Sequence, residues 1–285
     1  MLLHQALQQA TQQLAQQGIP SPANDAKRLL LWCMEIDSME YTQLSKSCSL
    51  NKKTLLKFGS VIEQRLLRRP VSQIVGSRAF YGRDFFVNTD VLDPRSDSEV
   101  IVDEVLLRLK KSGVERPKIL DLGTGSGAIL LTLLGECVDA SGLGVDISVK
   151  ALRVAQENAK RLSLEHRTTL KQGDWLHGVE GLFDVIVCNP PYVSEDQWFD
   201  LEEDIRLWEP RCALTCDGCD GYSAYEKIIP NVASFLKPSG FCAFEIGFGQ
   251  SMRVATMLEC SGFLTEITAD MEGIKRCVTG DLIDY

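Results

Sequence analysis

The tetrapeptide Asn189-Pro190-Pro191-Tyr192 holds the residue types best suited to chemistry in this chain. It follows the apolar run Phe183–Cys188, which predicts a buried strand and places the tetrapeptide at the carboxyl edge of a sheet, where open α/β folds bind ligands. The side-chain oxygen of Asn189 and the carbonyl of Pro190 can both accept hydrogen bonds from one planar NH2 group, and the prolines hold these acceptors rigid. Tyr192 can lay its ring against that group. The loop therefore indicates methylation of an amide or amino nitrogen, with an ordinary proline turn as the alternative.

A glycine-rich loop follows a second predicted strand. The apolar run Ile119–Leu122 leads into Gly123–Gly127, with the sequence Gly-Thr-Gly-Ser-Gly, and Ala128–Leu134 continues as a helix-competent stretch. Glycines allow a ligand to approach the backbone closely, and the N-terminus of the following helix offers free N–H groups. The dinucleotide fingerprint is G-x-G-x-x-G, which this loop misses by one residue. The spacing of this loop therefore does not match the dinucleotide pattern.

Two further strand ends carry residues suited to a nucleoside. Asp146 ends the predicted strand Gly142–Asp146 and lies about 20 residues past the glycine loop in the sequence. An acidic residue at this sequence spacing can accept hydrogen bonds from both hydroxyls of a ribose. Trp175 follows a third strand-like segment, Thr168–Lys171, and its indole could pack against adenine. The order of these residues across successive strand ends predicts a single site.

Together the motifs resemble class I S-adenosylmethionine-dependent methyltransferases, specifically the family that methylates the side-chain amide nitrogen of glutamine in peptide-chain release factors. The resemblance extends from about Pro70 to the C-terminus. Its further landmarks are Pro70–Gly76, Phe80–Phe85, Val91–Arg95, Glu209-Pro210, Asp220-Gly221, Glu245-Ile246-Gly247 and Gln250.

The resemblance implies S-adenosylmethionine as cofactor, the Gly-Gly-Gln glutamine of a release factor as substrate, and no catalytic metal. The cofactor site would comprise Gly123, Thr124, Gly125, Ser126, Gly127, Asp146, Trp175 and Asn189. Catalysis would rest on Asn189, Pro190 and Tyr192, and substrate binding on these three with Pro191. The methyl group of a sulfonium is already activated, so the protein would mainly supply position and electrostatics for a direct SN2 transfer. No strong general base is evident.

Two segments disagree about the protein substrate. The family usually has Pro-Arg-Pro-Glu/Asp-Thr-Glu after the hairpin, and this chain has Pro94-Arg95-Ser96-Asp97-Ser98-Glu99. Related enzymes that methylate a large-subunit ribosomal protein tend towards Pro-Arg-Ser there. The stretch Gln73–Gly76 favours the release-factor branch, which we expect.

The distribution of charge and the spacing of the glycines weigh against a nucleic-acid methyltransferase and a nicotinamide dehydrogenase. Residues 1–83 carry a net charge of +6 and the remainder −15, which together give −9. An acidic catalytic part disfavours an exocyclic-amine methyltransferase acting on nucleic acid, because phosphates need a basic footprint. We therefore expect no stable nucleic-acid partner. A nicotinamide dehydrogenase lacks support from the glycine spacing, and a non-catalytic binding module would leave the Asn-Pro-Pro-Tyr loop redundant.

Three cysteines form a competing motif. Cys212, Cys216 and Cys219 have the C-x3-C-x2-C spacing of the iron–sulfur ligands in radical S-adenosylmethionine enzymes, and three thiolates could also hold zinc. The motif lies in a connection after the Asn-Pro-Pro-Tyr loop, and radical enzymes lack a glycine loop of this kind. We therefore expect no metal.

Composition and periodicity predict an α/β protein with a doubly wound, mostly parallel sheet. The chain has 285 residues, 45% of them apolar and 24% charged. Neither a membrane span nor a signal peptide is indicated, and ten cysteines suit a reducing cytoplasm. Helical periodicity predicts a small helical domain over 1–70, and the resemblance implies that this domain serves substrate recognition. A β-hairpin linker is expected over 71–95 and the methyltransferase domain over 96–285.

Overall fold

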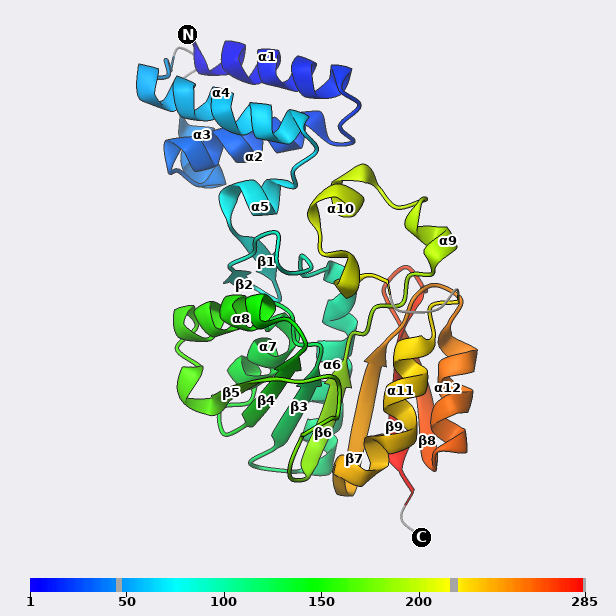
Figure 1. The fold of residues 1–285 in the computed structure, drawn as a ribbon. Helices are drawn as coiled ribbons and strands as arrows, with labels where there is room; N and C mark the ends of the chain where they lie inside the picture. The colour runs from blue at the N-terminus through cyan, green and yellow to red at the C-terminus, as the bar shows by residue number, and fades with distance from the viewer. Residues whose placement is uncertain (45–47, 216–219, 284–285) are drawn as a thin grey trace. The chain divides into compact units, whose positions relative to one another are not determined.

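The computed structural model describes residues 1–44, 48–215 and 220–283 (Figure 1). The chain divides into two units. One contains Met1–Ser77 together with Glu202–Trp208, and the other contains Arg78–Leu201 together with Glu209–Tyr285. The sequence-based boundaries at residues 70 and 95 stay predictions of functional domains.

The first unit is a small helical bundle. Apolar residues spaced three and four apart give α1 (Leu3–Gln16) and α2 (Pro22–Met34), which pack with α4 (Lys52–Leu66). Leu14, Leu29 and Leu30 are fully buried between these helices. Side chains cap two of the helices: Asp37 accepts backbone N–H bonds at the start of α3 (Ser38–Gln43), and Asn51 does so at α4. The predicted N-terminal helical part is confirmed.

The predicted hairpin is shorter than expected. Residues 71–75 form a helical turn, α5 (Val71–Val75), instead of a strand, because Val71, Ile74 and Val75 meet the bundle core at helical spacing. Gly76 ends this turn in the left-handed conformation, with φ of 71°. The hairpin itself comprises only β1 (Arg78–Phe80) and β2 (Arg83–Phe85).

A distant segment completes the helical unit. Helix α10 (Glu203–Trp208) lies in this unit, although about 130 residues separate it from α5. The buried Arg65 guanidinium joins the two parts: its Nε lies 2.7 Å from an Asp25 oxygen and its Nη2 lies 2.6 Å from an Asp204 oxygen. Trp208 Nε1 also donates to the Leu67 carbonyl. No local sequence pattern predicted this association.

The second unit is built on a seven-stranded sheet with the order β5-β4-β3-β6-β7-β9-β8 (Figure 1). The first five strands are parallel, and β9 pairs antiparallel with both β7 and β8. The predicted doubly wound, mostly parallel sheet is therefore confirmed. Its strands are β3 (Lys118–Leu122), β4 (Ser141–Asp146), β5 (Thr168–Gln172), β6 (Phe183–Cys188), β7 (Leu236–Glu245), β8 (Phe263–Ala269) and β9 (Lys275–Leu282).

Both faces of the sheet are buried under helices. Successive residues of a strand point to opposite sides of the sheet, so each strand contributes to two cores. Ile119 and Val185 belong to a core packed with α6 (Glu99–Ser112) and α7 (Ala128–Glu136). Leu120 and Ile186 belong to a core packed with α11 (Ser223–Val232) and α12 (Ser251–Cys260). The remaining α-helices of this unit are α8 (Val149–Arg161) and the short α9 (Glu195–Trp198). Among the described helices, none combines the length and apolar character that crossing a bilayer requires.

Candidate active site

The strand order reverses between β3 and β6. From β3 the chain builds outward through β4 to β5, and it then returns to place β6 on the other side of β3. Leu122 pairs with Cys188, so the loops that follow β3 and β6 leave the sheet side by side. Such a reversal opens a crevice at the carboxyl ends of the strands. The glycine loop and the Asn-Pro-Pro-Tyr loop therefore share one edge of the sheet.

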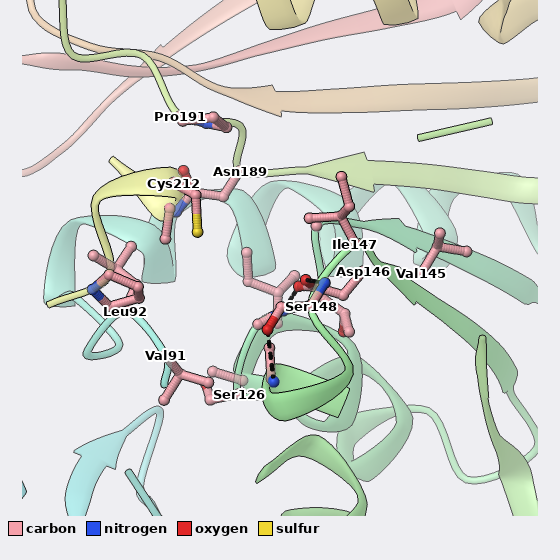
Figure 2. A pocket seen from close by; sticks show the side chains of 18 of the residues that line it. Val91, Leu92, Ser126, Val145, Asp146, Ile147, Ser148, Asn189, Pro191 and Cys212 are labelled. Atoms are coloured by element: carbon pink, nitrogen blue, oxygen red, sulfur yellow. Dashed lines mark hydrogen bonds between the residues drawn. The ribbon is translucent and has the colours of Figure 1, made fainter. Parts of the chain in front are cut away.

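A cavity of about 350 Å³ lies at this edge, within the usual range for small-molecule sites (Figure 2). It brings together most of the predicted site residues. Those that line it are Gly123, Thr124, Gly125, Ser126, Asp146, Trp175, Asn189 and Pro191. Gly127, Pro190 and Tyr192 are not part of its lining. Gly127 instead caps α7, and Pro190 is buried in the loop.

The glycine loop is held against β4 and turned back into α7. The backbone N–H groups of Gly123 and Thr124 both donate to the Val145 carbonyl, at 2.8 and 3.0 Å. Gly127 has a φ of 81°, and a Cβ there would lie 2.9 Å from a Leu131 methyl, so only glycine fits. The Thr124 hydroxyl donates to the Asp121 carboxylate, although burial raises the pKa of Asp121 to about 7.

Asp146 faces the cavity from the end of β4 (Figure 2). One of its carboxylate oxygens accepts from the Gly125 N–H and the other from the Ser148 N–H, each at 2.8 Å. Burial raises its pKa, and these two bonds oppose the shift. A carboxylate has about four lone-pair sites, so both oxygens keep capacity for a further donor. The group is fixed in place and can still accept hydrogen bonds from a ligand.

The residues that line the cavity have the chemical groups needed to bind the nucleoside part of S-adenosylmethionine. Asp146 offers the acceptors that a ribose diol needs, and Trp175 offers a flat apolar surface for a base. Val91 and Ile147 add apolar wall. Gly123 lies directly beside the Trp175 ring, because a Cβ there would be in van der Waals contact with it at 3.4 Å.

The Asn-Pro-Pro-Tyr loop is anchored through its two ends. Asn189 donates its side-chain N–H to the Ser98 hydroxyl at 3.3 Å. Tyr192 donates its hydroxyl to a Glu245 oxygen at 3.3 Å, and burial raises the pKa of the tyrosine. The Tyr192 carbonyl accepts from the Gln250 side chain at 3.2 Å. Tyr192 therefore packs partly against the sheet core, and the expected contact of its ring with substrate stays a prediction.

Comparison with known proteins identifies the family. Residues 5–76 match the model of the PrmC N-terminal domain, and residues 98–205 match that of the methyltransferase small domain. A release factor glutamine methyltransferase from Cereibacter sphaeroides is 38% identical over 97% of both chains. One from Caulobacter vibrioides is 39% identical over 95% of this chain and 93% of its own. The chain belongs to the release factor glutamine methyltransferase family.

A solved structure supports the fold of this family member independently. The hMettl16 catalytic domain, in complex with MAT2A 3'UTR hairpin 6, superposes with a TM-score of 0.54. It is 13% identical and covers 70% of this chain and 76% of its own. At that identity the likeness concerns the methyltransferase fold alone.

Several polar residues of this methyltransferase site were not singled out from the sequence. Arg95 lines the cavity, and its Nη2 lies 2.6 and 2.7 Å from the two oxygens of Glu209. Burial raises the pKa of Glu209 to about 7 even though Arg95 opposes the shift. Ser98 and Glu245 meet the two ends of the Asn-Pro-Pro-Tyr loop. The sequence segments that contain these residues were compared with the family, but the comparison assigned the residues no role.

The cysteine motif is described only in part. Cys212 is exposed and lines the cavity, whereas Cys216 and Cys219 lie outside the described residues. Within 1–44, 48–215 and 220–283, no three His, Cys, Asp or Glu residues are grouped as a metal site would require.

Gly221→Ala should disturb the Asn-Pro-Pro-Tyr loop of this methyltransferase. Gly221 has a φ of 77°, and a Cβ there would lie 2.4 Å from the Tyr192 carbonyl oxygen, so the loop must move. We expect the free energy of unfolding to fall by about 1–3 kcal/mol and kcat to fall more than cofactor affinity. Denaturant unfolding and steady-state kinetics measure the two effects. Gly113→Ala is the matched control, because Gly113 has a φ of 69° and a Cβ there would meet no described atom within 4 Å. Equal kinetics in both variants would contradict the prediction.

Proposed function

We propose that this protein transfers a methyl group from S-adenosylmethionine to the side-chain amide nitrogen (N5) of the glutamine in the Gly-Gly-Gln motif of peptide-chain release factors. The observation that carries the proposal is the meeting of two loops at one cavity, in a chain of this family. The glycine loop with Asp146 suits the cofactor, and Asn189 suits the amide that reacts.

The cofactor, when bound, supplies a methyl group activated by the positive charge of its sulfonium. The residues of the chain orient the acceptor. A glutamine amide nitrogen is a poor nucleophile because its lone pair is delocalised into the carbonyl. Accepting its two N–H groups on the Asn189 side chain and the Pro190 carbonyl would align the nitrogen and raise its electron density. The same acceptors favour the positive charge that develops on it.

The carboxylates near the loop in sequence are engaged elsewhere, which supports a mechanism without a strong base. Asp184 accepts from Lys237 Nζ at 2.6 Å and from the Lys118 N–H at 2.8 Å, at the opposite end of β6. Glu195 pairs with Arg211. The proton of an alkylated amide nitrogen is acidic enough to leave to solvent.

We assign the helical unit to recognition of the protein substrate, and we propose no stable nucleic-acid partner, because residues 84–285 are acidic. The eight cysteines that the structure describes are all free, which supports a reducing, cytoplasmic location. A ribosomal-protein glutamine is the second candidate substrate, on the strength of Pro94-Arg95-Ser96.

Mass spectrometry of methyl transfer tests the proposal. The purified protein is incubated with S-adenosylmethionine and a release factor, and the modified residue is mapped. We expect one added methyl on the Gly-Gly-Gln glutamine, and none on a release factor with that glutamine changed to alanine. Transfer to the large-subunit ribosomal protein alone would replace the release factor as substrate. Transfer to neither, with cofactor still bound, would overturn the proposed function.

A further inference from the structure

One buried side chain on α8 contacts two separate parts of the cavity wall and has no part in the mechanism above. Asn158 is fully buried, with 0% of its surface exposed. Its Nδ2 donates to the Phe86 carbonyl at 3.0 Å and to the Ser126 carbonyl of the glycine loop at 2.9 Å. Its Oδ1 accepts from the Phe86 N–H at 2.7 Å. A single amide therefore joins α8, the glycine loop and the segment that follows the hairpin.

These three backbone groups fix the direction of the Asn158 amide. The Phe86 N–H can be met only by an acceptor, so the amide oxygen must face it. The Phe86 and Ser126 carbonyls need donors, and the amide nitrogen supplies its two N–H groups to them. An aspartate would offer no donor, and a leucine of similar size would offer neither donor nor acceptor. Asparagine thus satisfies three backbone groups that would otherwise lose their partner.

The segment that Asn158 holds through Phe86 forms one wall of the cavity. Residues 90–95 all line the cavity, with Val91 among them (Figure 2). Val87 and Val91 are buried in a small apolar cluster with two residues of α8. Apolar packing presses the segment against the helix, but such packing is not directional. The paired hydrogen bonds to Phe86 supply the direction, because they fix both backbone groups at the start of the segment.

The opposite wall is the glycine loop, which is anchored at two points. The Gly125 N–H donates to the last residue of β4, as described above. Ser126, the next residue, is 5% exposed and lines the cavity, and its carbonyl is held by Asn158. Helix α8 approaches the loop closely here, because a Cβ at Gly127 would lie 3.3 Å from the Ala155 Cβ. Asn158 thus holds the part of the loop that lies next to α8.

We propose that Asn158 is a positioning residue of the cofactor site. Its amide keeps the glycine loop and residues 86–95 at the separation at which both walls can contact S-adenosylmethionine. Asn158 does not line the cavity, so it acts through the two walls and not by touching the cofactor. Because the cavity is taken as the cofactor site, this role rests on the proposed function.

Asn158→Leu removes the three hydrogen bonds and keeps a side chain of similar size. We expect the dissociation constant of S-adenosylmethionine to rise about 10- to 100-fold, as it does when a residue that orients a ligand-binding group is lost. At saturating cofactor, kcat should change little, because the Asn-Pro-Pro-Tyr loop keeps its anchors. Calorimetry measures the first quantity and steady-state kinetics the second. Asn158→Asp is a second variant, which should also raise the dissociation constant because it loses both donors.

Loss of a buried side chain also lowers stability, so the control must be destabilised without any change at the cavity. Leu258 on α12 is fully buried and does not line the cavity. Leu258→Ala should lower the melting temperature and leave the dissociation constant at the wild-type value. If a folded Asn158 variant bound S-adenosylmethionine as tightly as Leu258→Ala, the positioning role would be wrong.

Hydrogen exchange measured by NMR tests the same contact without cofactor or substrate. The Phe86 N–H should exchange slowly in the wild type and faster in Asn158→Leu, because its acceptor is gone. Equally slow exchange in both proteins would overturn the proposal.

Asp146→Ala separates this role from the assignment of the cavity. If Asp146→Ala weakens cofactor binding and Asn158→Leu does not, the positioning role alone is wrong. If neither change weakens binding, the positioning role is wrong and the cavity is not the cofactor site. The wild-type methylation assay judges the proposed reaction separately.

Discussion

Asn189→Ala is expected to lower kcat for glutamine methylation by about 100- to 1000-fold, the usual cost of losing one group that stabilises developing charge. Asn189 lines the cavity at the end of β6, and its side chain would be the acceptor that aligns the substrate amide. Affinity for S-adenosylmethionine should fall only modestly, because Asp146 and the glycine loop remain. Single-turnover kinetics and calorimetry measure the two quantities.

Asn231→Ala is the control for this variant, since Asn231 is exposed on α11, does not line the cavity, and donates its side-chain N–H to the Lys227 carbonyl. It should behave as the wild type. An Asn189→Ala enzyme with full activity would remove the residue from the mechanism.

Asp146→Ala is expected to weaken S-adenosylmethionine binding by about 100-fold or more, because hydrogen bonds to a charged acceptor contribute about 1.5–3 kcal/mol each. The change also leaves the N–H groups of Gly125 and Ser148 without their acceptor, so the glycine loop loses its anchor. Calorimetric titration with S-adenosylmethionine measures the effect. Burial raises the pKa of Asp146, so wild-type affinity should fall as acidic pH protonates it.

Asp139→Ala provides the matched comparison, because this exposed aspartate lies just before the opposite end of β4. It should leave affinity unchanged. If Asp146→Ala bound the cofactor as tightly as Asp139→Ala, the assignment of this cavity edge to the ribose would be wrong.

The central sheet and the placement of its ligand loops could be predicted because the signals are local. Apolar runs such as Phe183–Cys188 end at a breaker, and each predicted strand end carried its own polar or glycine-rich residues. Parallel strands bring such ends to one edge whatever the details of packing. Convergence of Asp146, Gly125 and Asn189 therefore followed from strand order alone.

The residues that hold the loop in place could not be predicted in the same way. Glu245, Gln250 and Ser98 lie on three different elements, and each acts through a contact with the Asn-Pro-Pro-Tyr loop. Contacts of this kind join positions roughly 50 to 90 residues apart and leave no spacing to detect. The helix at Val71–Val75 was missed for another reason, because a single turn is too short to display a period.

The discontinuous make-up of the helical unit has a consequence for synthesis of the chain. Ser77 leaves the ribosome about 130 residues before Trp208, a delay of about 7 to 26 seconds at ~5–20 residues per second. During that interval Arg65 already has Asp25 as a partner but still lacks Asp204. The first unit to be translated is therefore completed only after four of the seven strands of the sheet, β3 to β6, have been synthesised.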